Sequence, residues 1–350
     1  MRINTMRLFG YELKKLFSGA ALWVFVGLCV IFNIWSMPTW LNRDFDTTTP
    51  FQENVFQHYN TSEVAEIYVS ALGLTGSVAE RMKAKYDALQ VVVDESAIAG
   101  YSFSPYFGDY TYFMHLNLFA NFGVLGRLLL QGALLAVLLA LLCVGYEQIN
   151  HTEHSVYTTK TGRRIMRCKI AASLAAGAGI YALLAIITLA IYFTVFDFSN
   201  VWNSSVSSGF NFIWDELAGL RPFATWQSFT VASYLWASLG VSLGLVICFS
   251  LMGAVVGTLS KNGYIGFLVV LLLNAVCLFL PGMISENSYA HFVAAHTPIW
   301  LWNNSRLWFT EGKFFTLWQN FELWGTGISL LILAAFCILA VKRFEKRNIA

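Results

Sequence analysis

Six stretches of this chain contain no Asp, Glu, Lys or Arg, and each is long enough to cross a lipid bilayer as a helix. They are residues 16–42, 128–146, 170–196, 222–260, 262–285 and 323–341. About 20 helical residues, rising about 1.5 Å each, span a hydrocarbon core about 30 Å thick. Lipid offers no partners to backbone N–H and C=O groups, and these stretches lack the two-residue alternation of a barrel strand. Helices are therefore the expected spanning elements.

Composition also favours a membrane protein, because 57% of the residues are hydrophobic and only 12% are charged, against about 25% charged in soluble proteins. The sequence predicts an all-α integral membrane protein with six transmembrane helices, an N-terminal amphipathic interfacial helix, and a helical external subdomain between the first two spans. The expected spans are residues 18–37, 122–146, 170–196, 228–259, 264–284 and 323–341.

Basic residues gather in one set of the segments that join these spans. The set consists of residues 1–17, 147–169, 260–263 and 342–350, and it holds 14 of the 22 lysines and arginines but only four of the 20 acidic residues. The positive-inside rule places such segments in the cytoplasm. We therefore expect a multi-pass protein of the cytoplasmic membrane with both termini inside, and external segments at 38–121, 197–227 and 285–322.

The N-terminal segment has the pattern of a helix that lies in the membrane surface. At 100° per residue its apolar side would consist of Met6, Phe9, Leu13, Leu16 and Phe17. Its polar side would consist of Arg7, Tyr11, Lys14 and Lys15. A plain cytoplasmic extension of the first span is the alternative, and a turn at Ser18 and Gly19 favours the bent arrangement.

The external segment 38–121 is far longer than an ordinary connection and should form a small subdomain. Ser77 with Glu80 makes a capping box for a helix through Leu89, and Ser62 can cap another helix through Ala71. The aromatic stretch 101–122 fits an interfacial anchor or a substrate-contacting surface.

The segment 285–322 is rich in aromatic residues, and its two apolar parts, 290–301 and 308–321, are too short to span. Two short external or re-entrant helices are expected there, with interfacial loops packed by aromatics as the alternative.

The sequence has no HExxH or GxxxxGK[ST] pattern, so no catalytic, metal-binding or cofactor-binding residue is assigned and the chain is not expected to be an enzyme. The predicted span interiors hold no ionisable group, since Arg127 and Glu147 lie near opposite ends of the second span. Gln131 and Asn274 are explained by helix-helix hydrogen bonds. All six cysteines lie in or beside spans, which indicates no disulfide framework. Any work must draw its energy from another polypeptide.

The segment 147–169 joins the second and third spans. Its acidic start, short polar stretch, Gly-Arg turn and cationic end predict a short helix at the membrane surface between two transmembrane helices. A docked protein could push such a helix. An ordinary positive-inside loop is the alternative.

With these features the chain resembles the permease subunits of ABC-2 type transporters. The resemblance rests on Tyr11 to Leu16 ahead of the first span, on the loop 147–169 with Gly162 and Arg163, and on six spans with a long loop before the last. In that family the loop between spans two and three is a coupling helix that docks in a groove of the ATPase subunit. The implied coupling residues are Thr152, Glu153, Val156, Tyr157, Lys160, Arg163 and Arg164. The implied interfacial-helix residues are Arg7, Leu13, Lys14 and Lys15.

The resemblance implies the membrane subunit of an exporter that moves an amphipathic cargo such as a peptide, an antibiotic or a lipid. Its partners would be two copies of a P-loop ATPase, which hold the ATP and Mg²⁺, and a second permease, identical or homologous. Lipid surrounds it, and no nucleic acid is expected. The large segment 38–121 departs from the family, since many members have only a short loop there. A membrane scaffold or sensor with a ligand-binding external subdomain is the first alternative, and a secondary transporter is the second.

Overall fold

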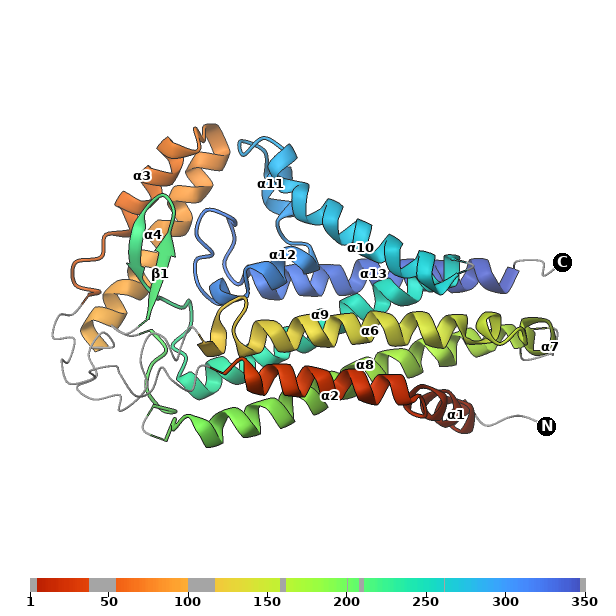
Figure 1. Ribbon diagram of the computed structural model, residues 1–350. Helices are drawn as coiled ribbons and strands as arrows, with labels where there is room; N and C mark the ends of the chain where they lie inside the picture. The colour runs from red at the N-terminus through yellow and green to blue at the C-terminus, as the bar shows by residue number, and fades with distance from the viewer. Residues whose placement is uncertain are drawn as a thin grey trace.

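The computed structural model describes residues 5–37, 55–99, 117–157, 162–199, 201–207, 211–260 and 262–346. These residues form a bundle of long apolar helices with a smaller lobe at one end (Figure 1). Among them, four helices are long and apolar enough to cross a membrane. They are α6 (Val124–Ile149), α8 (Ile165–Val195), α9 (Val231–Leu259) and α13 (Phe321–Lys346).

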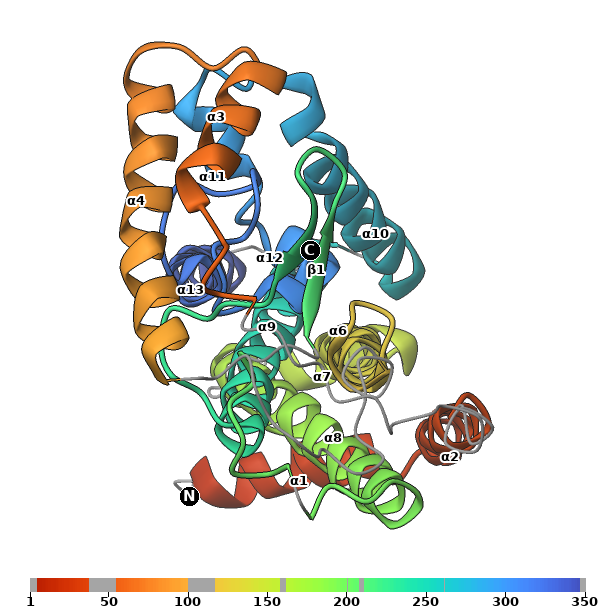
Figure 2. The same ribbon diagram turned by 90° about the vertical axis from the view of Figure 1, so that its left-hand side faces the viewer.

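Two shorter apolar helices occupy the places of the first and fifth predicted spans. They are α2 (Ala20–Trp35), of 16 residues, and α10 (Gly263–Phe279), of 17 residues. The chain bends by 62° between α1 (Thr5–Phe17) and α2, at the predicted turn of Ser18 and Gly19, so the pair together makes a fifth apolar element. Figure 2 shows α2, α6 and α13 end-on while α1 lies across the view, so α1 runs crosswise to the bundle.

Helix α6 lies at the centre of the bundle. In its most apolar window 78% of the residues are buried inside the protein, against 28% for α13, which lies at the edge. Small residues let the neighbouring helices approach closely. A Cβ added at Gly253 of α9 would lie 3.0 Å from the carbonyl oxygen of Val137 and 3.1 Å from its Cα.

The polar residues predicted to join the helices do so. Asn33 of α2 and Gln131 of α6 exchange two side-chain hydrogen bonds of 2.9 Å, and Asn33 also donates to Thr188 Oγ1 of α8 over 3.2 Å. Asn274 of α10 donates to the Val270 carbonyl, at 2.8 Å, and approaches the sulfur of Met252 in α9. These contacts satisfy polar groups that lipid would leave unpaired.

The lobe is built from three separate parts of the chain and lies opposite the end that carries both termini (Figure 1). Its elements are α3 (Thr61–Ala71), α4 (Gly76–Ala99), β1 (Phe212–Asp215), β2 (Gly219–Pro222), η2 (Pro281–Met283), α11 (Tyr289–Ala294), α12 (Pro298–Asn303) and η3 (Ser305–Leu307). Strands β1 and β2 pair antiparallel, with Phe212 opposite Pro222. The all-α prediction is therefore wrong for this hairpin, whose tight turn places Gly219 at φ +73°.

Three local predictions for the lobe need correction. Asn60, not Ser62, caps α3, because its side chain accepts a hydrogen bond from the Ser62 backbone N–H. Helix α4 begins at Gly76, which places Ser77 inside it, and runs ten residues beyond Leu89 to Ala99. It continues because its apolar positions keep a helical spacing into the core of the lobe. The buried ones are Met82, Tyr86, Leu89 and Val93.

Segment 285–322 does contain two short helices, α11 and α12, but neither lies in its second apolar part. Residues 308–320 are not helical, since Phe309, Lys313 and Asn320 adopt the left-handed backbone region and Gly312 has φ +67°. The first apolar part is divided into α11 and α12, with α12 starting at Pro298. Most of the predicted aromatic anchor, up to residue 116, lies outside the described residues.

Two glycines of α9 provide a test of the close packing. Gly253→Ala should lower the thermal stability of the purified protein in detergent, because its Cβ meets backbone atoms that cannot rotate away; overpacking costs about 1–3 kcal/mol. Gly240→Ala is the matched control, since nothing lies within 4 Å of its added Cβ. Equal melting temperatures for the two variants would contradict this packing.

Candidate functional site

Four charged side chains meet at the end of the bundle that carries both termini. They are Glu12 and Lys15 of α1, Glu147 of α6 and Lys169 of α8, here called the helix-end cluster. Lys15 Nζ lies 2.8 Å from Glu12 and 3.6 Å from Glu147, and Lys169 Nζ lies 3.6 Å from Glu12 and in direct contact with Glu147. Two carboxylates and two ammonium groups give the cluster no net charge.

Three side chains of the cluster are buried while that of Lys15 is 33% exposed, and the buried charges make the internal balance important. The exposed fractions are 1% for Glu12, 2% for Glu147 and 0% for Lys169. Lys169 also donates a 2.6 Å hydrogen bond to the carbonyl of Cys143, and the Lys15 ammonium lies 4.8 Å from the centre of the Tyr146 ring. Removing one member of a buried ion pair leaves an uncompensated charge, so the cluster holds α1, α6 and α8 together only as a complete set.

The loop between α6 and α8 is attached to this cluster. It contains α7 (Glu153–Tyr157) and η1 (Gly162–Arg164), and α7 lies at the same end as both termini (Figure 1). The buried Tyr157 hydroxyl donates to Glu147 over 3.4 Å. Burial and the neighbouring Glu147 carboxylate raise the pKa of this hydroxyl far above its usual value, so it remains a donor.

The same loop contacts the last turn of α13. The rings of Tyr157 and Phe344 meet edge to face with centroids 5.2 Å apart. Arg163 donates to the backbone carbonyl of Glu345 over 3.1 Å, and Arg167 at the start of α8 forms two bonds of 2.9 and 3.0 Å with the Glu345 carboxylate. Because the loop contacts α6 and α13 directly, a movement of the loop would displace the ends of both helices.

The other residues implied by the resemblance fall into two groups. Thr152 is exposed, while Glu153 and Val156 are partly buried; Arg164 lies in η1, and Lys160 lies outside the described residues. In α1, Arg7 and Lys14 are exposed and Leu13 packs against the core. Lys15, expected on the polar side of α1, instead faces the helix-end cluster, because two buried carboxylates lie on that side.

Sequence reasoning missed the partners that complete these contacts. The residues concerned are Glu12, Lys169, Phe344 and Glu345. The sequence offered only an indirect signal, namely Glu147 closing a long uncharged stretch and Glu12 followed by Lys15 at helical spacing.

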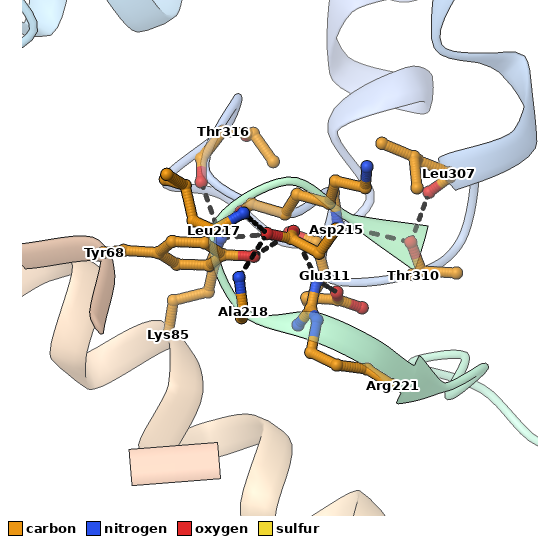
Figure 3. Close-up of polar contacts among 12 residues, drawn as sticks. Tyr68, Lys85, Asp215, Leu217, Ala218, Arg221, Leu307, Thr310, Glu311 and Thr316 are labelled. Atoms are coloured by element: carbon orange, nitrogen blue, oxygen red, sulfur yellow. Dashed lines mark hydrogen bonds and ion pairs between the residues drawn. The ribbon is translucent and has the colours of Figure 1, made fainter. Parts of the chain in front are cut away.

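A second buried set of charges lies in the lobe and is here called the lobe cluster; it consists of Lys85, Asp215, Arg221 and Glu311 (Figure 3). The Arg221 guanidinium lies 3.0 Å from Asp215 and 3.0 Å from Glu311. Tyr68 of α3 donates its hydroxyl to Asp215, whose other oxygen accepts from the backbone N–H groups of the β-turn. The cluster therefore joins α3, the β-hairpin and the segment after η3.

Lys85 of α4 completes the lobe cluster through backbone groups. Its Nζ donates to the carbonyls of Glu311, Lys313 and Thr316 over 3.0, 2.5 and 2.8 Å. Figure 3 labels Lys85 together with two of these acceptor residues, Glu311 and Thr316. Three N–H bonds of an ammonium meet three acceptors. Burial lowers the pKa of Lys85 to about 7, although the Glu311 carboxylate opposes this shift. We infer that Lys85 fixes the non-helical segment 311–316 on α4.

Neither cluster has the composition of a metal centre. Across the described ranges, no group of three or more His, Cys, Asp or Glu side chains is arranged to hold a metal ion. All six cysteines carry free thiols. Comparison with protein-family models, with curated proteins and with solved structures finds no match to this chain.

The charge balance of the helix-end cluster is testable by removal and rescue. Lys169→Met should destabilise the purified protein strongly, by about 3–5 kcal/mol, because it leaves buried carboxylates in excess. Adding Glu147→Gln restores neutrality and should recover part of the melting temperature. Lys14→Met is the control, since Lys14 is exposed on α1. A double variant no more stable than Lys169→Met alone would refute the balance argument.

The role of Lys85 is testable against its neighbour Lys83. Lys85→Met should increase hydrogen exchange in residues 307–320, because three buried carbonyls lose their donor at about 1–3 kcal/mol each. Lys83→Met should not, since the Lys83 side chain is 43% exposed and its ion pair with Glu66 lies at the surface.

The pH dependence of stability tests the burial of Lys85 in a second way, by comparing wild type with the same Lys85→Met variant. Between the folded pKa of about 7 and the ordinary value of 10.5 the unfolded chain binds more protons, so wild-type stability should rise with pH in this window. The stability difference between wild type and Lys85→Met should therefore be constant below pH about 7 and shift in favour of wild type above it. A difference that is independent of pH would contradict the burial of a titrating Lys85.

Proposed function

We propose that this chain is the membrane-spanning permease subunit of an ATP-driven exporter of the ABC-2 type. The observation that carries the proposal is the attachment of the short loop between α6 and α8. Its inner side is bound to α6 and α13 through Tyr157 and Arg163, while Thr152 and Ser155 are exposed to a partner. The sequence has no P-loop motif, so the energy comes from a separate ATPase that docks on this loop.

The topology of the proposal follows from the charge distribution. The loop and both termini lie at one end of the bundle, opposite the lobe (Figure 1), and the basic segments belong to that end, which is therefore the cytoplasmic one. The six apolar helices, α2 and α10 included, are the spans. Helix α1 lies along the inner surface of the cytoplasmic membrane, where Met6, 80% exposed, meets lipid.

In the proposed mechanism, the contacts of the loop transmit a movement of the ATPase to the membrane helices. Two ATPase copies close on ATP and Mg²⁺, and this movement displaces α7. The displacement passes to α6 through Tyr157 and Glu147, and to α13 through Phe344 and Glu345. Since α6 packs on α8 and α9 at the centre of the bundle, the spans exchange two alternative packings against a second permease, identical or homologous. The chain itself catalyses no reaction.

An apolar cavity supports an amphipathic cargo. It has a volume of about 430 Å³ and lies between the first half of α13 and the segment around α11 and α12. Its walls include Trp318, Trp324 and Ile328, with Thr297 and His296 as polar groups. Burial lowers the pKa of His296, so the cavity is uncharged at neutral pH. Apolar walls with a few polar groups suit a peptide, an antibiotic or a lipid.

The proposal is tested by isolating the chain from its native membranes in mild detergent. A P-loop ATPase should copurify and the complex should hydrolyse ATP. Ser155→Trp, which places a bulky side chain on the exposed side of α7, should reduce ATPase recovery at least about tenfold. Arg81→Glu, exposed on α4 in the lobe, should leave recovery unchanged.

Recovery of the intact chain without an ATPase would refute the proposal. A different partner bound to the lobe would then favour the scaffold or sensor alternative, and cargo movement driven by an imposed ion gradient without nucleotide would favour a secondary transporter.

A further inference from the structure

A groove of about 950 Å³ opens between the ends of α9 and α13, at the end of the bundle that carries both termini. Its lining combines three cations, all on α13, with exposed apolar side chains. The cations are Lys342, Arg343 and Lys346. The apolar side chains are Leu259, 54% exposed, and Leu339, 60% exposed.

The positive charge of this groove is not neutralised by the described part of the chain. The acid of the same helical turn, Glu345, points to the other side of α13, where its carboxylate binds Arg167 and its carbonyl accepts from Arg163. No described carboxylate lines the groove or forms an ion pair with its three cations. A cluster of three positive charges therefore stands open to an anion.

Basic residues at the end of a helix have a simpler explanation, because they interact favourably with the C-terminal end of the helix dipole. That explanation accounts for the presence of cations but not for the groove or for its apolar floor. Leu339 precedes Lys342 by three residues on α13, and Leu259 is the last residue of α9; both helices are long enough to cross a membrane. This is the depth at which lipid head groups meet acyl chains.

We propose that the groove binds an anionic phospholipid. Lys342, Arg343 and Lys346 surround the phosphate and the anionic head group, and Leu259 and Leu339 lie along the upper part of an acyl chain. Clusters of Lys and Arg at the end of a transmembrane helix attract anionic lipids in this way. The apolar floor makes the lipid, rather than free phosphate, the fitting ligand.

The bound lipid would also order the last turn of α13. That turn holds Phe344 against Tyr157 and the Glu345 carbonyl against Arg163. Phe344 also lines the groove, so the lipid site and the loop between α6 and α8 share the last turn of α13. Lipid binding itself requires no nucleotide and no ATPase, so the lipid site can be tested independently of the proposed function.

The experiment measures lipid binding to the purified full-length chain by native mass spectrometry. Wild-type protein should bind phosphatidylglycerol at least about tenfold more tightly than phosphatidylcholine. The double variant Lys342→Gln with Lys346→Gln should lose this preference. Its matched control, Arg81→Gln with Lys83→Gln, removes the same charge from α4 of the lobe, at the opposite end of the molecule, and should keep it.

Two further arms identify the ligand. Lys342→Arg with Lys346→Arg keeps the charge and should keep the preference, which also shows that the changes at these exposed positions leave the fold intact. Inorganic phosphate at millimolar concentration should not displace phosphatidylglycerol. Displacement by inorganic phosphate, equal affinity for the two lipids, or an unchanged preference in the Lys342→Gln with Lys346→Gln variant would each overturn the proposal.

Discussion

The structure depends on the requirement that buried charges be balanced within the protein. The helix-end cluster meets it with two carboxylates and two ammonium groups from α1, α6 and α8. Water does not reach the buried Glu12, Glu147 and Lys169, so the three helices are held in one register by a set of contacts that is favourable only when complete. Apolar packing alone would allow these smooth helices to slide, because lipid is as apolar as their side chains.

In the lobe, buried charges are likewise balanced within the protein, here between segments that are far apart in the sequence. Arg221 is shared between Asp215 of the hairpin and Glu311, while Lys85 binds three backbone carbonyls of the segment 311–316. That segment has no helix or strand to satisfy its carbonyls, and a buried carbonyl without a donor is costly. A lysine on α4 therefore replaces secondary structure as the hydrogen-bond partner, which explains how an irregular segment can be buried.

The sequence predicted what is encoded locally. The six uncharged stretches coincide with apolar helices, and the bend at Ser18 and Gly19 and the pairing role of Gln131 are confirmed, because hydropathy, turn residues and isolated amides act within a few residues of their position. The ends of α4, the β-hairpin and the irregular segment 308–320 were missed, since each is decided by distant contacts. The same holds for the sites: Tyr157 and Arg163 could be selected from their loop, whereas Lys169, Phe344 and Lys85 gain their roles only through folding.

Helix α6 connects the two ends of the molecule. At one end Glu147 takes part in the helix-end cluster and receives the hydroxyl of Tyr157. At the other end the Gly126 carbonyl accepts a 3.0 Å hydrogen bond from the Trp302 indole of α12, and a Cβ added at Gly126 would overlap the carbonyl of Asn121. A buried helix of 26 residues moves as a rigid rod over about 39 Å. Under the proposed function, a displacement applied to the loop at Tyr157 would therefore reach α12, beside the apolar cavity, without passing through any flexible connection.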